Sequence, residues 1–306
     1  MKLRIGYLIS GITTGFILLL TFIWTQPDGK LHIVFCDVGQ GDAAYIRFAD
    51  GRDMLIDGGP DNGRVLTCLG KHMPFWDRRI NIVLMSHPQA DHIGGLTEVI
   101  KRFSVDYVVR SDVANATEGY QALMSAIAQK HIPMKFLTQG DRIAIGTTSL
   151  SVIWPTQEQI AKADGSRATL ASRMSEASPS ANILGSTSIQ LNDYCLVVAM
   201  RYGTFDAVFT GDADSRVEAN YDKLQVFSDP IELLKVPHHG SKTGMTLAFV
   251  DWLKPKLAVI SVGKNSYGQP SKEAVDMLQS VNSKVLRTDQ KGDIEVVSDG
   301  KNWEVK

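Results

Sequence analysis

The sequence predicts an α/β protein built as a four-layer αββα sandwich, with two sheets packed face to face and helices on the outside. Short apolar runs rich in β-branched residues recur along the chain, helix-like stretches interleave with them, and both halves repeat this pattern. The chain has 306 residues, of which 44% are hydrophobic and 21% are charged, so it can bury a large core. We expect the folded domain to cover residues 31–306.

The first expected element is a membrane-spanning helix over residues 5–24. This run contains no charged residue, and a helix of this length reaches across the ~30 Å core of a bilayer. Lys2 and Arg4 lie in the short end 1–4, which places that end in the cytoplasm and the domain outside, on a single-pass anchor. A cleaved signal peptide followed by secretion is the alternative. Residues 25–30 form a polar linker.

The following elements alternate between strands and helices. In the first half, apolar runs predict strands at 31–37, 43–48, 54–57 and 81–86. In the second half, similar runs predict strands at 195–202, 205–210, 232–236, 256–262, 285–288 and 293–298. Helices are expected, several with a Ser or Thr suited to cap the first turn, at 95–103, 118–131, 215–224, 243–252 and 271–281. Residues 156–188, rich in Ala, Ser and Thr, predict a flexible insertion.

Charge and cysteine content limit the function classes. The formal net charge of -1 gives no overall attraction to nucleic acid, although a local basic groove is compatible with it. Cys36, Cys68 and Cys195 form neither a C-x-x-C pair nor a tight ligand cluster. We therefore expect no disulfide framework and interpret all three as small buried hydrophobic residues.

The segment SHPQADHIGG at 86–95 carries the strongest signal for chemistry. It follows an apolar strand directly and ends in two glycines that open a helix. His87, Asp91 and His92 therefore share a tight loop on which side chains can converge. Imidazole nitrogens with a carboxylate suit zinc, manganese or iron, so this loop predicts a metal site.

Two further strand ends supply candidate residues. In VFTGDAD, Gly211 lets the backbone approach closely, and Asp212 can bind or bridge metal ions; capping of the following helix is the alternative. In LKVPHHGSKT, His238 and His239 follow a strand, and one can bind metal while the other donates a proton to a leaving group. The residues leave this choice open. We take His238 as the metal ligand and His239 as the catalytic residue.

Ordered motifs make the chain resemble the metallo-β-lactamase superfamily, and within it the extracytoplasmic hydrolase domain of ComEC-type competence proteins. The motifs are FCDVGQGDA (35–43), LIDGG (55–59), SHPQADHIGG, FTGDAD, VPHHGS, SVGKNSYGQP (261–270) and RTDQKGDIEV (287–296). The resemblance implies the αββα sandwich, with one or two zinc or manganese ions at the sheet edge. The many membrane helices of a DNA-uptake channel have no counterpart here. We expect that the chain forms no pore, and that any partner channel protein is unidentified.

Two positions depart from the family pattern. Gln89 stands where relatives carry Asp or His, and Gln269 stands where they carry His. A neutral amide is a weaker ligand for transition metals than either, so the resemblance implies a weakened or single-metal centre. Asp42 and Asp57 lie in turns beside the proposed site; Asp57 is expected to orient a ligating histidine, and simple turn stabilisation is the alternative for both.

Two functions follow from these patterns. The first is metal-dependent hydrolysis of a phosphodiester such as DNA outside the cytoplasm, related to competence and DNA uptake. The second is a catalytically impaired binding module, supported by Gln89 and Gln269. β-Lactam hydrolysis is disfavoured because H-x-H-x-D is absent. Basic residues flank the motifs and could contact phosphates, but each is better interpreted as solvated surface charge: Lys71, Arg78, Arg79, Lys235, Lys242 and Lys264. The histidines interpreted as structural are His32, His72 and His131.

Overall fold

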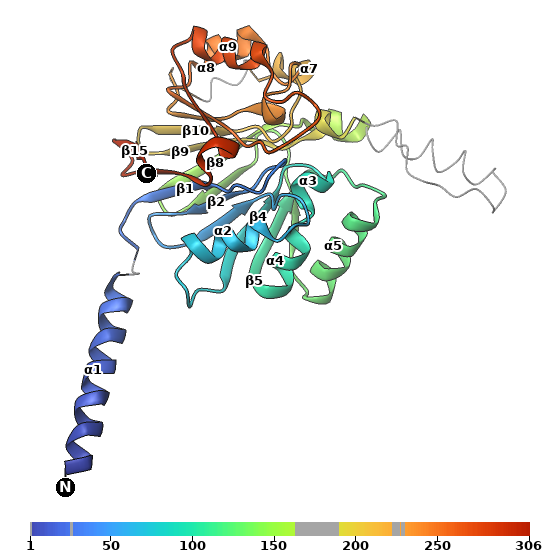
Figure 1. The fold of residues 1–306 in the computed structure, drawn as a ribbon. Coiled ribbons are helices and arrows are strands. Elements are labelled where there is room, and N and C mark those ends of the chain that lie inside the picture. Colours follow the sequence, from blue (N-terminus) through green and yellow to red (C-terminus); the bar gives the residue numbers. More distant parts are fainter. Residues whose placement is uncertain (1, 25–26, 163–189, 222–226, 228–229) are drawn as a thin grey trace, which may run out of the picture.

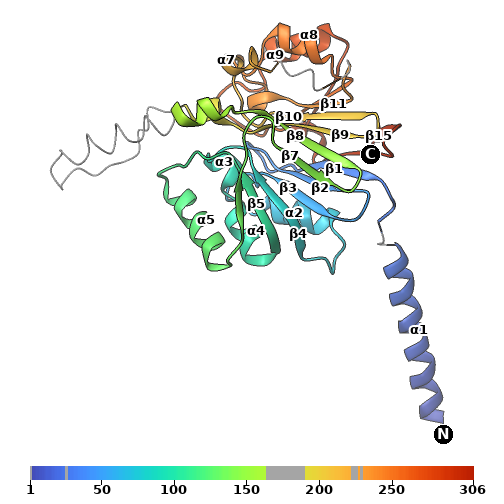
Figure 2. The ribbon, with the colours of Figure 1, turned by 180° about the vertical axis from the view of Figure 1, so that it is seen from behind.

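The computed structural model describes residues 2–24, 27–162, 190–221, 227 and 230–306. Two sheets pack face to face and helices cover both outer faces, as Figures 1 and 2 show. The predicted four-layer α/β sandwich is therefore confirmed. The predicted insertion over 156–188 lies largely outside the described residues.

The first sheet has eight strands in the order β15-β14-β1-β2-β3-β4-β5-β6. Their bounds are β1 Leu31–Phe35, β2 Ala44–Arg47, β3 Asp53–Ile56, β4 Arg79–Met85, β5 Ser104–Arg110, β6 Met134–Phe136, β14 Ile294–Ser298 and β15 Trp303–Val305. The pairs from β3 to β6 are parallel, whereas β15, β14, β1, β2 and β3 pair antiparallel. The sequence predicted β1 to β4 and β14, and missed β5, β6 and β15.

The second sheet has seven strands in the order β13-β12-β11-β10-β9-β8-β7. Their bounds are β7 Arg142–Ile145, β8 Thr148–Trp154, β9 Val197–Tyr202, β10 Phe205–Phe209, β11 Leu233–Lys235, β12 Leu257–Ile260 and β13 Lys284–Arg287. Strands β10 to β13 are parallel, and β7 to β10 pair antiparallel. The sequence predicted every strand of this sheet except β7 and β8.

Helices form the two outer layers. Below the first sheet in Figure 1 lie α2 Arg64–His72, α3 Ala90–Ile93, α4 Leu96–Arg102 and α5 Glu118–Gln129. Above the second sheet lie α7 Ser215–Glu218, α8 Leu247–Leu253 and α9 Lys272–Ser280, and the short α10 Thr288–Lys291 follows β13. The side chains of Thr246 and Ser271 cap α8 and α9. The helix predicted from Thr243 therefore begins four residues later, at Leu247.

Alternation along the strands divides the core into three layers. In β1, Leu31, Ile33 and Phe35 face the space between the sheets, while Val34 packs under the helices of the first sheet. The second sheet shows the same division, and Phe35 of β1 stacks on Phe209 of β10 with ring centroids 6.1 Å apart. Successive strand residues point to opposite faces, so the central strands contribute to a core on both sides.

The N-terminal helix α1 covers Lys2–Trp24 and extends away from the sandwich in both views. Its large hydrophobic side chains between Tyr7 and Phe22 are exposed. Among the helices of the described residues, none has the length and apolar character needed to cross a bilayer. The predicted membrane-spanning helix over 5–24 is therefore not supported.

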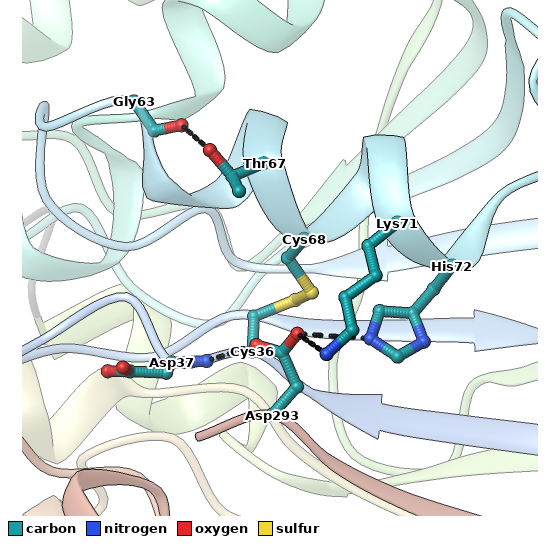
Figure 3. The surroundings of a disulfide bond; sticks show 8 residues. All are labelled: Cys36, Asp37, Gly63, Thr67, Cys68, Lys71, His72 and Asp293. Atoms are coloured by element: carbon teal, nitrogen blue, oxygen red, sulfur yellow. Dashed lines mark hydrogen bonds and ion pairs between the residues drawn. A yellow bond between two sulfur atoms is a disulfide. The ribbon is translucent and has the colours of Figure 1, made fainter.

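A disulfide joins Cys36 and Cys68, with their Cα atoms 5.8 Å apart (Figure 3). The expectation of no disulfide was therefore wrong for these two residues. Cys36 follows β1 directly, and Cys68 lies on the buried face of α2, which packs on the outer face of the first sheet. The two cysteines are 32 positions apart in the sequence, so only the packing of α2 against this sheet brings them together. Cys195 is buried and free, as expected.

Candidate metal centre

Candidate residues gather at one end of the sandwich because the strands before them run in the same direction. Strands β3 and β4 are parallel neighbours, as are β10 and β11. Asp57 follows β3, His87 follows β4, Asp212 lies just beyond β10, and His239 lies just beyond β11. The carboxyl ends of parallel strands are where α/β folds assemble ligand sites. The two sheets place these loops against one another.

Four side chains from three of these loops form the centre of the cluster. They are Asp91 and His92 of α3, Asp212, and His239, and one donor atom from each lies within 4.8 Å of the others. His92 Nε2 is 3.1 Å from Asp212 Oδ1, and His239 Nε2 is 3.4 Å from both Asp212 Oδ2 and Asp91 Oδ2. Two imidazoles and two carboxylates form a donor set suited to zinc or manganese.

Both histidines are fixed so that Nε2 faces the centre of the cluster. His92 Nδ1 donates to Asp57 Oδ2 at 2.8 Å, and His239 Nδ1 donates to the carbonyl oxygen of Ser261 at 2.8 Å. Asp57 is itself held by the amide and hydroxyl of Ser86. Hydrogen bonds of this kind orient metal-ligating histidines and fix their tautomer. Asp57 thus lies where an orienting carboxylate is needed.

The centre is rich in buried negative charge. Asp42, Asp57, Asp91 and Asp212 lie within one cluster of contacts, and the ammonium of Lys235 offsets one of these charges. Within the described part of the chain, Asp212 Oδ1, His92 Nε2 and His239 Nε2 are buried and have no hydrogen-bond partner. Buried polar atoms normally have partners, so their shared direction fits a cation held among them.

The pKa values of the cluster follow from this charge. Burial raises the pKa of Asp212, but His239 and His92 outweigh that effect and hold it well below its usual value. Conversely, burial lowers the pKa of His239, but Asp212 and Asp42 raise it well above its usual value. The carboxylates thus stabilise positive charge on the imidazoles. A bound divalent cation would supply that positive charge in place of the imidazole protons.

Asp42 and Lys235 form a buried ion pair beside the cluster. Lys235 is only 4% exposed, and its ammonium contacts Asp42 Oδ2 and donates to the carbonyl oxygen of Gly211 at 2.9 Å. The interpretation of Lys235 as solvated surface charge was therefore wrong. Burial raises the pKa of Asp42, but Lys235 and His239 lower it well below its usual value. Lys235 ends a strand buried on both faces, and a single lysine in such a run was the available signal.

Close backbone packing holds the loops in register. Gly41 precedes Asp42 with φ +139, and a Cβ there would lie 2.2 Å from the carbonyl oxygen of Asp91. Asp42 N donates to that same oxygen at 3.2 Å. Gly211 has φ +50, and a Cβ there would lie 2.3 Å from Cys195 Sγ. Glycine is required at both positions, which explains why these motifs contain it.

His87 lies beside the centre but outside the group of four donors. The centroids of the His87 and His92 rings lie 4.1 Å apart. His87 Nδ1 lies 3.0 Å from Ser86 Oγ and 3.6 Å from Cys195 Sγ. Burial and the neighbouring His92 lower the pKa of His87 to about 3, so it is a neutral imidazole. Cys195, interpreted as a small hydrophobic residue, also accepts from Asp212 N. It therefore has polar contacts at this site that the sequence did not indicate.

His238 and the two glutamines lie at the edge of the cluster. His238 Nε2 is 3.9 Å from Asp212 Oδ2, and both His238 and His239 have left-handed backbone angles, with φ 48 and 53. Gln89 donates to Asn192 Oδ1 at 2.7 Å. Gln269 accepts from Gln40 at 2.7 Å and donates to the carbonyl oxygen of His238 at 3.3 Å. Both amides thus make hydrogen bonds between neighbouring loops.

Comparisons with known proteins agree with this architecture. Residues 36–166 match the family described as Metallo-beta-lactamase superfamily. The chain is 24% identical over 297 residues to ComE operon protein 3 of Bacillus subtilis, covering 91% of this chain and 34% of that protein. It is 21% identical over 272 residues to Competence protein ComA of Neisseria gonorrhoeae, covering 87% of this chain and 32% of that protein.

The chain thus spans about a third of the length of these curated relatives. Among solved structures, the metallo-beta-lactamase fold protein YhfI from Bacillus subtilis superimposes with a TM-score of 0.53 at 13% identity. The match covers 87% of this chain and 99% of that one. At this identity the likeness shows the fold. Together, the matches confirm the predicted resemblance to ComEC-type competence proteins.

Proposed function

We propose that this chain, a relative of the ComEC-type competence proteins with a metallo-β-lactamase domain, is a metal-dependent hydrolase of phosphodiesters, with DNA as substrate. One observation carries the proposal. Asp91, His92, Asp212 and His239 direct two carboxylates and two imidazoles at one point, and each imidazole is fixed by a hydrogen bond on its other nitrogen. This is the arrangement of a transition-metal site.

The distances support the opposite roles for His238 and His239 from those that the sequence suggested. His239 Nε2 lies 3.4 Å from carboxylate oxygens of Asp91 and Asp212, so we assign His239 as a ligand. His238 is part-exposed, and its Nε2 lies 3.9 Å from Asp212. Burial, together with His239 and Lys235, lowers the pKa of His238 despite Asp212. A neutral His238 can donate a hydrogen bond to a phosphate oxygen.

The bound ion, zinc or manganese, would polarise the phosphoryl group and activate water for attack. Asp57 and Ser261 hold the ligating histidines in register, and Lys235 balances the charge of Asp42. His87 has a lowered pKa and stays neutral beside the cluster, where it can accept a hydrogen bond or bind a second ion.

We further propose that the domain works outside the cytoplasm. The Cys36–Cys68 disulfide supports this location, because such bonds form and persist in oxidising compartments. DNA entering or surrounding the cell would then be accessible to the site. This localisation can be tested by protease accessibility of the domain in intact cells.

The hydrolase proposal is tested on the purified protein, stripped with chelator and reloaded with manganese or zinc. The substrates are single- and double-stranded DNA and a small chromogenic phosphodiester, with nitrocefin as the β-lactam control. Asp91→Ala and His239→Ala should lose bound metal and turnover together. Two exposed residues provide matched controls, and Asp251→Ala and His131→Ala should retain both. A wild-type protein that binds metal but cleaves no phosphodiester would contradict the proposal.

A binding module without turnover is the second candidate, and the two glutamines support it. Gln89 and Gln269 use their amides in hydrogen bonds to Asn192, Gln40 and the His238 backbone. A second ion near His87 would therefore lack a strong donor. This candidate predicts that the protein binds DNA, as measured by fluorescence anisotropy, without cleaving it. It also predicts that Gln89→Asp raises metal occupancy.

A further inference from the structure

A second group of metal-binding side chains surrounds the disulfide. Cys68 and His72 lie four residues apart on α2, so both project from the same helix face. Asp293 immediately precedes β14, and its Oδ2 lies 3.0 Å from His72 Nε2. Donor atoms of Cys68, His72 and Asp293 lie within 4.8 Å of one another, and Figure 3 shows them beside Cys36. None of these residues belongs to the candidate metal centre.

Opening the disulfide would add a second sulfur donor to this group. The Cys68 sulfur lies near the donor atoms of His72 and Asp293, and the Cys36 sulfur is bonded to it. Two thiolates, one imidazole and one carboxylate make a four-donor set that suits tetrahedral zinc. Zinc sites also use two histidines at positions i and i+4 of one helix face, which is the spacing of Cys68 and His72 on α2.

The surroundings fit a cation at this place. Lys71 Nζ lies 3.0 Å from Asp293 Oδ2, so an ammonium already pairs with a carboxylate oxygen that the ion would bind. The Lys71 side chain is 63% exposed and can swing into solvent. Asp293 Oδ1 accepts from the amide of Asp37, which fixes the carboxylate. Lys71 and His72 also line a cavity of about 400 Å³, which gives an ion a path from solvent.

We propose that Cys36, Cys68, His72 and Asp293 form a redox-gated site for a zinc-class divalent ion. A dithiol reductant would give the disulfide two electrons and two protons, so that two thiols form and the reductant becomes a disulfide. The ion then displaces one proton from each thiol and binds both thiolates. In the oxidised state the disulfide joins β1 to α2; in the reduced state the ion would join both to the turn before β14.

Cobalt is the probe, because a thiolate bound to cobalt(II) gives a charge-transfer absorption in the near ultraviolet. The candidate metal centre offers only nitrogen and oxygen donors, so cobalt bound there lacks this band. The full chain is reduced, freed of reductant without oxygen, and titrated with cobalt. The band should appear in the reduced protein and be absent from the oxidised protein. Far-ultraviolet circular dichroism must show that the reduced protein is folded before cobalt is added.

Variants separate this site from binding by other thiols. The double variant Cys36→Ser/Cys68→Ser should abolish the band, each single variant should keep at most a weaker band from its one remaining thiolate, and Cys195→Ser should keep the full band. His72→Ala should weaken cobalt affinity by more than the ~10–100-fold that loss of an outer hydrogen-bond partner costs. Lys71→Met should strengthen it, because the competing ammonium is removed, whereas Lys101→Met on α4 should have no effect. The proposal is overturned if the reduced protein is unfolded, if no band forms, or if His72→Ala leaves the affinity unchanged.

Discussion

Replacing Lys235 by methionine should destabilise the protein more than the loss of any exposed charge. Methionine has a similar length and no charge, so the change removes the ammonium and largely retains the volume. It leaves Asp42, which is only 5% exposed, without the cation that contacts its Oδ2. It also removes the hydrogen bond that Lys235 donates to the carbonyl oxygen of Gly211.

Two estimates of the cost agree. Breaking a buried ion pair by removing one partner typically costs ~3–5 kcal/mol. Asp42 can instead take up a proton, and protonating a carboxyl of ordinary pKa at pH 7 costs about 4 kcal/mol. Without Lys235, the strongest interaction that favours the ionised form, burial raises the folded-state pKa of Asp42, although His239 still lies 3.5 Å from its Oδ1. The variant should therefore lose stability as pH rises. The deficit should therefore shrink to about 1.5 kcal/mol at pH 5.

The assay is urea denaturation of the chelator-treated protein at pH 7 and pH 5. Lys256→Met is the matched control, because Lys256 is half-exposed and pairs with Glu232 at 2.9 Å. Solvent screens the half-exposed Lys256, and the buried Glu232 keeps its hydrogen bond from Asp206 N, so this variant should lose less stability than Lys235→Met. The double variant Lys235→Met/Asp42→Asn should recover much of the loss. A deficit no larger than that of Lys256→Met, or one that is equal at both pH values, would refute the reasoning.

Three other predictions concern stability. Cys68→Ser opens a loop of 32 positions and should lower the free energy of unfolding by ~3–4 kcal/mol in urea titrations; an unchanged value would contradict this. Leu233→Ala, in the core between the sheets, should cost ~2–5 kcal/mol, whereas the exposed Leu247→Ala should cost under ~0.5 kcal/mol; equal losses would contradict the packing. Burial, partly offset by a hydrogen bond from Thr246 N and increased by Asp214, raises the pKa of Glu218 to about 7. The unfolded state releases this proton near pH 4.5 and the folded state only near pH 7, so stability falls as pH rises from about 4.5 to 7. Glu218→Gln should flatten the decline in thermal midpoint over that range.

Local pattern was sufficient for most strands and missed β15, the edge strands β6 and β7, and their neighbours β5 and β8. Strands β10, β11 and β12 are buried runs of β-branched and aliphatic residues, so composition alone identified them. Strand β6, with the sequence MKF, is exposed at all three positions, and β7 is mostly exposed. Their structure depends on pairing with β5 and β8. Such pairing has no signature in a short polar segment.

The disulfide and the Asp42–Lys235 pair required information that no local pattern holds. Each joins segments that are distant in the chain, 32 positions apart for the cysteines. Lysine is almost always solvent-exposed, so the base expectation for Lys235 was surface charge. Only the packing of β11 between β10 and β12 shows that the Lys235 side chain is buried and therefore needs a buried carboxylate as its partner.

The two glutamines show what sequence reasoning could and could not say about the site. The family resemblance implied that Gln89 and Gln269 replace stronger donors and that the metal centre is weakened. The structure places Asp91, His92, Asp212 and His239 in one complete donor set that needs neither glutamine. Gln269 instead links Gln40 to the backbone of His238, where the chain holds a left-handed conformation that costs energy in a non-glycine residue. The amide that cannot bind metal strongly thus stabilises the turn that positions His239.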